Sequence, residues 1–278
     1  MGYAEGASGP LAVRLERPRL EELLVCEAED AGARVELGAR VEAAAPDGRV
    51  VVRGAAGARR HEWLVAADGA AAPVSGRLLG RGRCASSALI GVEARVVLDR
   101  RLPCDEFYTI HGYRYAPGFF AWVVPVSGGR EALVGLASRR RPLRALELLL
   151  HDLDSTLGVS GASGLRSGLV LRGPPPRSPA RGRLVGVGDS VCTSKPFTGG
   201  GLYAVSLLAP RLGEALTGGG LGDYLEAYRA LREELLLQRI LSSAALVAKP
   251  ILHAVQALMG AGCRVDYDRH STVLRCLL

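Results

Sequence analysis

The chain has little lysine, few aromatic residues and no long apolar run. Lys195 and Lys249 are the only lysines among 35 basic residues, and the arginines are scattered along the 278 residues. Nucleic-acid binding needs clustered positive charge, so the net charge of +7 does not indicate a nucleic-acid partner. The most apolar late stretch, residues 242–260, is interrupted by charged and polar residues. It therefore lacks the ~20 consecutive apolar residues that span a bilayer.

The spacing of cysteine and histidine excludes the usual metal sites. The six cysteines form no CxxC pair and the five histidines lack metal-ligand spacing, so no metal is expected. An even number of cysteines allows disulfides, which leaves their redox state open. The N-terminus has no signal-peptide pattern, and we therefore expect a cytoplasmic protein that is soluble or peripheral at a membrane.

The most informative stretch runs from Gly182 to Leu216. An apolar strand over residues 184–187 is expected to deliver Asp189 to its carboxyl end, where ligands of open α/β sheets bind. Three glycines, 199–201, then open a helix, so a ligand can approach backbone N–H groups at the positive end of the helix dipole. A flexible loop also uses glycine, but the ordered combination GDS, Pro196 and TGGG favours a ligand site.

With the spacing GDS-x4-KP-x-TGGG, this stretch resembles the second flavin fingerprint of the para-hydroxybenzoate hydroxylase superfamily, and it is most similar to the geranylgeranyl reductase family. Aromatic hydroxylases usually carry a histidine shortly after GD, whereas Val191 and Cys192 stand here. The resemblance implies FAD as cofactor, with the aspartate on the ribityl chain and the glycines against the pyrophosphate and the flavin ring. It implies cofactor contacts at Gly188, Asp189, Pro196, Gly199, Gly200, Gly201 and Leu202.

The first part of the chain is typical of the second half of a βαβ unit. Strands are predicted at residues 11–16 and 33–37, with a helix from Pro18 to Ala31 between them. Arg17 begins the pattern R-x-x-L-x-x-x-L, which in the superfamily implies contact with the FAD pyrophosphate. Any exposed arginine near a helix start would match equally well.

A β-meander is predicted next, over residues 41–45, 49–54 and 61–69. The last strand ends at Asp68 and Gly69, in an element that resembles ADG-x2-S-x-V-R of these flavoproteins. Ala72 and Ser75 depart from that element. The resemblance implies that Asp68 and Gly69 lie in the cofactor-side loop.

Aromatic residues are only 5% of the chain, but they gather between residues 107 and 122, among strand-like segments of a predicted substrate domain. The string PGFFAWVVP resembles PGGYAWIFP of the reductases, in which this strand lines the cavity for an isoprenoid chain. The resemblance implies substrate contacts at Phe120, Trp122 and Pro125. Aromatic residues at alternating strand positions are also common in ordinary cores. A helix is predicted over residues 142–154.

The predicted fold class is α/β: an incomplete FAD-binding Rossmann-like domain of the para-hydroxybenzoate hydroxylase type, an inserted and mainly antiparallel substrate domain, and C-terminal helices. The expected boundaries are 1–83 for the partial FAD-binding domain, 84–170 for the substrate domain, 171–220 for the return to the first domain, and 221–278 for the helical region. Within the last, helices are expected before and after Pro250, and the final residues resemble reductase C-termini that fold over the substrate domain.

The superfamily's opening strand–GxGxxG–helix unit, which holds the ADP half of FAD, is absent from this sequence. The nearest string, residues 80–85, follows no strand and carries two arginines. We expect a late-assigned start, a split gene or a repurposed protein. A separate N-terminal fragment would then be a partner that completes the flavin site.

The resemblance implies a flavin-dependent oxidoreductase that reduces C=C bonds of a prenyl (geranylgeranyl) lipid by hydride transfer from reduced FAD. The electron donor, NAD(P)H or ferredoxin, is not indicated. Tyr115, Cys192 and Lys195 are weak proton-donor candidates, and no residue is nominated as catalytic. The alternatives are an FAD-dependent monooxygenase of an aromatic substrate and a noncatalytic fragment or partner subunit.

Overall fold

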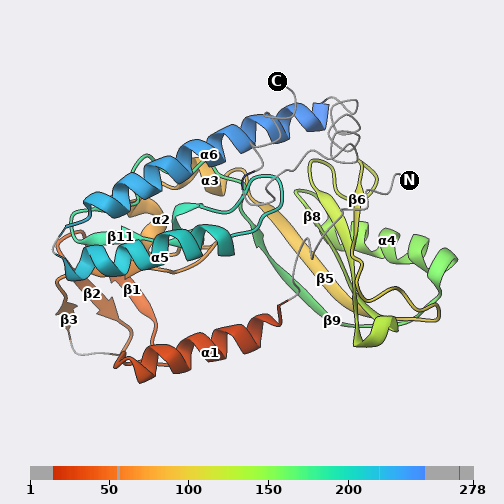
Figure 1. Cartoon of the computed structure of the whole chain (residues 1–278), viewed down its shortest axis with the longest axis horizontal. Coiled ribbons are helices and arrows are strands. Elements are labelled where there is room, and N and C mark those ends of the chain that lie inside the picture. Colours follow the sequence, from red (N-terminus) through yellow and green to blue (C-terminus); the bar gives the residue numbers. More distant parts are fainter. Residues whose placement is uncertain (1–14, 55–56, 219, 248–268, 270–278) are drawn as a thin grey trace.

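The computed structural model describes residues 15–54, 57–218, 220–247 and 269. A five-stranded sheet with helix α4 (Pro142–Leu157) forms one half of the molecule, and two small sheets with the other helices form the second half (Figure 1). Strands β5 (Leu89–Leu98) and β9 (Val159–Val170) lead from one half into the other.

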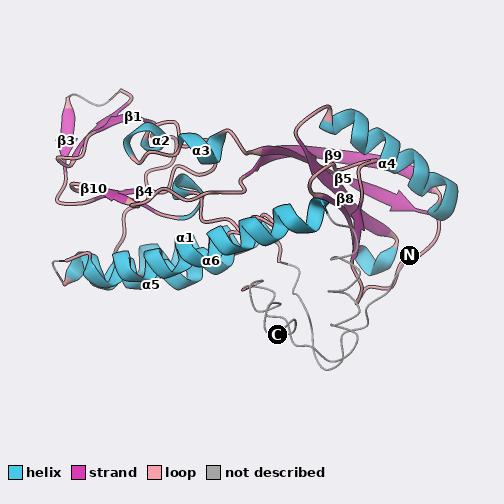
Figure 2. Cartoon of the chain, turned by 90° about the horizontal axis from the view of Figure 1, so that it is seen from above, coloured by secondary structure: helices cyan, strands magenta, loops and turns pink. Residues whose placement is uncertain are grey.

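The large sheet is antiparallel, with the strand order β6-β7-β8-β5-β9. Its other strands are β6 (Tyr108–His111), β7 (Phe120–Val126) and β8 (Glu131–Ser138). Helix α4 covers one face (Figure 2), where Leu146 and Leu149 pack against alternate residues of β5 such as Val92 and Val96. Glu93, Gly135 and Trp122 lie on the opposite face, because side chains alternate along a strand. We call this opposite face the Trp122 face.

Strand β9 has no counterpart in the sequence prediction. Its sequence, VSGASGLRSGLV, is rich in glycine and serine and has no apolar alternation. It forms because the edge of β5 is available over its full length, from Leu89 opposite Val170 to Leu98 opposite Val159. Backbone hydrogen bonding to a neighbour therefore overrides weak strand propensity here.

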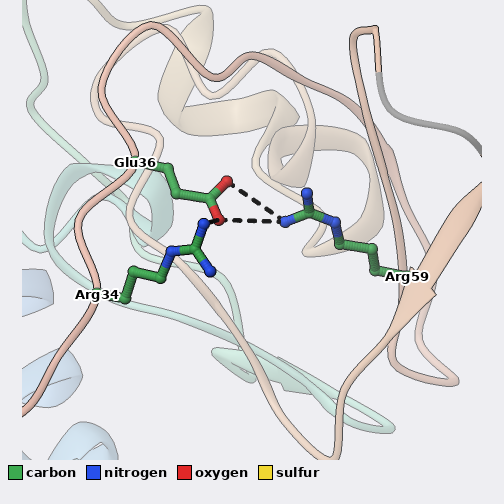
Figure 3. Close-up of polar contacts among 3 residues, drawn as sticks. All are labelled: Arg34, Glu36 and Arg59. Carbon is green, nitrogen blue, oxygen red and sulfur yellow. Dashed lines mark hydrogen bonds and ion pairs between the residues drawn. The ribbon is translucent and has the colours of Figure 1, made fainter.

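The predicted strand over residues 33–37 is wrong. This segment is a loop in which Val35 and Leu37 are exposed, and no strand among the described residues pairs with it. Glu36 anchors the loop instead, since its carboxylate accepts the Arg59 Nη1–H at 3.3–3.4 Å and lies 3.4 Å from Arg34 Nη2 (Figure 3). The preceding helix agrees with its prediction and runs as α1 (Arg17–Asp30). The predicted strand at 11–16 lies mostly outside the described residues.

The predicted meander is correct for its first two strands, β1 (Val41–Ala44) and β2 (Arg49–Val52), and wrong for the third. Strand β3 (Ala58–Arg60) pairs with β2, and the chain then turns so that β4 (Leu64–Ala66) pairs in parallel with β11 (Leu184–Gly186). A short strand, β10 (Ala180–Arg181), completes this sheet in the order β10-β11-β4. The apolar run that the sequence assigns to the meander thus joins the other small sheet.

Helices α5 (Leu202–Thr217) and α6 (Gly222–Val247) pack on this small sheet, with α2 (Ser75–Leu78) and α3 (Gly82–Ala85) on its other side (Figure 2). The hydroxyl groups of Tyr224 and Tyr228 on α6 donate to the carbonyl oxygens of Gly186 and Pro176 at 2.7 and 2.9 Å. Burial raises the pKa of both tyrosines, so they stay neutral donors. No helix within the described residues has the length and apolar character to cross a membrane. The helix and chain end predicted after Pro250 lie outside the described residues.

Candidate functional site

The loops after β4 and β11 meet at one edge of the small sheet. The two strands are parallel, with Leu64 opposite Leu184 and Ala66 opposite Gly186, so their carboxyl ends coincide. The Ala66 carbonyl accepts hydrogen bonds from the Val187 amide at 3.0 Å and the Ser190 hydroxyl at 2.7 Å. The 3₁₀ turn η2 (Gly188–Val191) follows directly, so the sheet places Asp189 beside the Asp68 loop.

The Asp68 carboxylate is used within the protein. It accepts the backbone amides of Val74 and Ser75 at 3.0 Å each, and it also accepts the Ser75 hydroxyl. These amides begin α2 and have no partner within the helix, so Asp68 acts as their cap. Asp68 therefore shapes the loop, while Gly69, at φ +71°, allows the chain to turn out of the strand.

Arg81 is a buried residue that links the two loops and that the sequence did not reveal. Its side chain is buried, with 5% of its surface exposed, and it donates to the carbonyl oxygens of Gly69 and Asp189 at 3.1 Å each and to that of Ala70. Burial lowers the pKa of Arg81, and the carboxylates of Asp68 and Asp189 partly offset this. One guanidinium thus joins both loops. In the sequence, Arg81 stood out only as an arginine between two glycines, in the string 80–85 that does not match a dinucleotide-binding motif.

A disulfide between Cys84 and Cys192 makes a second connection between the same loops. Both cysteines are buried and pack with Leu171. Cys84 lies one turn after Arg81, and Cys192 lies three residues after Asp189 in a left-handed conformation at φ +59°. The sequence left disulfides open and did not indicate this pair. Among the described residues, Cys26 and Cys104 are free and exposed.

The three glycines before α5 differ in what the protein requires of them. Gly199 has φ +72°, and a Cβ atom there would lie 2.7 Å from Val170 Cγ1, so its own fold demands glycine. Gly200 and Gly201 lack a positive φ. A Cβ on Gly200 would meet the Lys195 side chain at 3.1 Å and Thr198 Oγ1 at 3.5 Å, and one on Gly201 would meet nothing closer than 3.6 Å. Among the described residues, neither a positive φ nor a close backbone contact explains the glycine at either position.

The start of α5 has no side-chain cap. Gly201 occupies the N-cap position without a side-chain hydrogen bond, and the first turn contains no acidic residue. Amides in the first turn of a helix have no intrahelical partner and lie at the positive end of the dipole. Asp189 lies beside them, with its Oδ1 accepting the Ser194 hydroxyl and placed 3.6 Å from the position of a Gly201 Cβ. Leu202 begins the helix and is exposed.

Pro196 is held by Arg172, which lies two residues after the end of β9. Its carbonyl accepts the Arg172 Nε–H at 2.9 Å, and the Arg172 guanidinium lies 5.9 Å from the centre of the Phe119 ring. Burial and the nearby Arg239 lower the pKa of Arg172. The glycine-rich loop, residues 195–201, is therefore attached to the end of β9 in the large sheet as well as to η2.

The aromatic residues predicted for the substrate lie on the Trp122 face. Phe120 and Trp122 contact each other edge to face at 6.0 Å. His111 on β6 lies 5.6 Å from Phe120 and 6.4 Å from Phe197 of the glycine-rich loop, so ring contacts run from the sheet to the loop. Pro125 lies on the other face, under α4, since it alternates with Trp122 and Val124 along β7.

Arg17 is not brought to this site by any contact among the described residues. It lies at the start of α1, is largely exposed and pairs with Glu21 on its own helix at 2.6 Å. The described residues also contain no group of three or more His, Cys, Asp or Glu side chains that could hold a metal ion.

No family model matches the chain. It is 32% identical over 223 residues to digeranylgeranylglycerophospholipid reductase 2 of Methanopyrus kandleri, covering 71% of this chain and 53% of that protein. It is 30% identical over 237 residues to the enzyme of the same name from Methanothermobacter thermautotrophicus, covering 76% and 60%. The chain is a relative of the geranylgeranyl reductases. It spans between half and two thirds of the length of these two relatives.

Solved structures show the same fold. A geranylgeranyl bacteriochlorophyll reductase-like protein from Thermoplasma acidophilum superposes with a TM-score of 0.71 at 18% identity, over 96% of this chain and 74% of the other. A flavin-dependent brominase superposes with a TM-score of 0.62 at 16% identity, over 95% and 75%. The predicted fold class of the geranylgeranyl reductases is therefore confirmed, and halogenases share it.

Proposed function

We propose that the edge formed by Asp189, Gly200 and Gly201 binds FAD, and that the chain is the flavin-proximal and substrate-binding part of a reductase of prenyl-lipid C=C bonds. The observation that carries the proposal is the pair of bare glycines at an uncapped helix start beside a carboxylate. The protein does not need these glycines for its backbone, but a ligand that approaches the first-turn amides does. An anionic or hydrogen-bonding ligand of flat shape fits this cradle.

In this proposal each residue has a binding or positioning task. The Asp189 carboxylate accepts hydrogen bonds from ribityl hydroxyls, and the first amides of α5 face the pyrophosphate and the polar edge of the flavin ring. Arg81 and the Cys84–Cys192 bridge hold the two loops together, so the site is ordered before the cofactor arrives. When bound and reduced, FAD supplies the hydride for the alkene.

The Trp122 face supports a prenyl lipid as substrate. Phe120 and Trp122 offer apolar surface that continues through His111 and Phe197 to the glycine-rich loop. Burial of hydrocarbon stabilises binding by about 25 cal/mol per Å2, which suits a long alkene chain. Pro125 would act from the opposite face by stiffening β7 at the end of this surface. The relatives' names specify a digeranylgeranylglycerophospholipid, and we propose that class of substrate here.

A second polypeptide segment is part of the proposal. No residue of α1 is buried, and β4 is an edge strand of its sheet among the described residues. Apolar side chains around this region are exposed on three elements, including Leu24 on α1, Val65 on β4 and Leu202 on α5. We propose that a βαβ unit with a GxGxxG turn covers them and brings the ADP half of FAD toward Arg17. The unit is either a separate N-terminal fragment or a segment contiguous with this chain.

The electron donor, NAD(P)H or ferredoxin, and a cytoplasmic location with peripheral contact to the membrane remain parts of the proposal. Contact with the membrane is favoured because a lipid with two prenyl chains resides in a bilayer, where the enzyme has to reach it.

The test is a flavin titration of the chain and of two valine variants on α5. Gly201→Val fills the cradle, while Gly213→Val places the same side chain where a Cβ meets nothing within 4 Å on the same helix. We expect flavin binding, followed by absorbance near 450 nm, to be lost in Gly201→Val and retained in Gly213→Val. Equal binding by both variants, or none by the wild type with and without an added N-terminal βαβ segment of the Methanopyrus relative, contradicts the proposal.

A further inference from the structure

One row of residues crosses the whole Trp122 face. By strand register, Arg166 lies opposite Glu93, Glu93 opposite Gly135, Gly135 opposite Trp122, and Trp122 opposite Thr109. Residues in direct register across antiparallel strands share a face and have neighbouring Cβ atoms. The row therefore brings an indole, a glycine and a carboxylate together on three adjacent strands.

The Trp122 ring lies across Gly135 and reaches Glu93. A Cβ atom on Gly135 would be 2.5 Å from Cζ2 and 2.6 Å from Cε2 of the indole, so the ring occupies the space of a missing side chain. At the far side, Trp122 Nε1–H donates to Glu93 Oε2 at 2.9 Å. The ring is thus supported below by glycine and held at its polar end by one carboxylate.

This row separates a part of the face without charged side chains from a charged part, in which the Arg95–Glu131 ion pair lies beside the apolar residues Leu133 and Val124. The next row toward the glycine-rich loop consists of Gly168, Gly91, Ala137, Phe120 and His111. Two residues beyond Glu93 in the other direction, Arg95 pairs with Glu131 at 2.6 Å, and Ser127 donates to the same carboxylate at 2.9 Å. The flat indole lies at the border between these parts.

We propose that Glu93 is a positioning residue that holds Trp122 flat as the distal wall of the prenyl-binding surface. This inference rests on the proposed function. A partly buried indole N–H needs an acceptor. Without Glu93, the ring turns its N–H toward water, uncovers Gly135 and brings the charged part of the face next to the alkene chain. Glu93 thereby determines how far along the face a hydrocarbon chain can extend.

The experiment uses Trp122 as its own reporter. The chain has two tryptophans, so Trp63→Phe leaves Trp122 as the only one. In this background we compare Glu93→Leu, which removes the acceptor, with Glu93→Gln, which retains a carbonyl oxygen. Glu131→Gln is the matched control, because it changes a carboxylate on the same face that is bonded to Arg95 and Ser127 and not to Trp122.

The first readout is acrylamide quenching and the emission maximum of Trp122. We expect Glu93→Leu to increase the quenching constant at least twofold and shift the emission to the red, while Glu93→Gln and Glu131→Gln stay close to the parent. Circular dichroism shows whether each variant is folded. An unchanged Trp122 signal in folded Glu93→Leu overturns the positioning role.

The second readout is binding of geranylgeraniol in detergent micelles, followed by the same fluorescence. We expect about tenfold weaker binding in Glu93→Leu, as for loss of a hydrogen bond to a charged group, and near-parent binding in the other two variants. Parent-like affinity in Glu93→Leu overturns the role in substrate positioning. If the parent itself does not bind geranylgeraniol while its Trp122 signal still depends on Glu93, the proposed function fails and the hydrogen-bonded indole stands.

Discussion

Helices α5 and α1 lie in the same half of the molecule but depend on their surroundings to different degrees. The 16-residue α5 buries Ala204, Leu208, Leu212 and Ala215 against the small sheet and α6. The 14-residue α1 buries none of its residues, although Leu23 and Leu24 are apolar. Short helices are marginal in water without tertiary packing. Helix α5 is therefore supported by packing within the described fold, whereas α1 is not packed against other described residues.

The largest difference is expected from one substitution on each helix. Leu208→Ala removes a side chain that is 1% exposed, whereas Leu23→Ala removes one that is 50% exposed. We expect a loss of about 2–5 kcal/mol for the first because a cavity remains, and less than about 0.5 kcal/mol for the second. Urea unfolding followed by circular dichroism measures both. A similar cost at the two positions would mean that α1 is packed.

Arg81 tests whether α5 depends on the joined loops as well as on packing. Arg81→Met removes the donor to three carbonyl oxygens and leaves Asp68 and Asp189 without their shared cation. We expect a loss of about 3 kcal/mol in the free energy of unfolding and weaker flavin binding. Arg77→Met on α2, where the arginine is exposed, is the control and should change neither.

The Cys84–Cys192 disulfide gives a second test of whether the connection between the two loops stabilises the fold. Cys84 and Cys192 close a loop of 108 residues, so reduction widens the unfolded ensemble and loosens the connection to η2. We expect reducing agent to lower the stability of the wild type by about 2–3 kcal/mol. The double variant Cys84→Ser/Cys192→Ser should have the same free energy of unfolding as the reduced protein, and this value should not change when reductant is added. A wild type that is equally stable with and without reductant would exclude a stabilising bridge.

The smallest effect is expected at His111, which joins the large sheet to the glycine-rich loop. Burial lowers the pKa of His111 in the folded state, so below pH ~6.5 the unfolded chain binds a proton more readily than the folded one. Stability should therefore decrease as the pH falls through the unfolded-state pKa, and the change should be weaker in His111→Gln. Unfolding curves at pH 7 and pH 5 give the comparison. Identical pH dependence in both proteins would remove His111 from the linkage.

Local patterns in the sequence were sufficient for much of the fold. Apolar periodicity with Pro18 at the start and Gly32 at the end predicted α1, periodicity predicted α4 over residues 142–154, and the apolar run before GDS predicted β11. The glycine string predicted the start of α5, because a helix that exposes its first amides to a ligand needs residues without side chains. The resemblance to geranylgeranyl reductases rested mainly on the GDS-x4-KP-x-TGGG stretch, which includes this glycine string.

Pairing partners distant in sequence could not be predicted this way. Strand β9 exists because β5 offers an edge, and residues 33–37 form no strand because no other described segment pairs with them. Glu93 and Trp122 are 29 residues apart, and their hydrogen bond depends on the order β8 between β5 and β7. Neither residue type nor spacing carries that information.

By itself the sequence determined helices α1, α4 and α5 and strand β11, since periodicity, glycine and proline act locally. Only the tertiary structure decided that Arg81 and Cys84 lie against the Asp189 turn, and that Pro125 and Trp122 lie on opposite faces of one sheet. The physical reason is that a buried guanidinium, a disulfide and a flat indole each need a partner from a segment remote in sequence. Those partners come together only when the parallel and antiparallel strand pairings have formed.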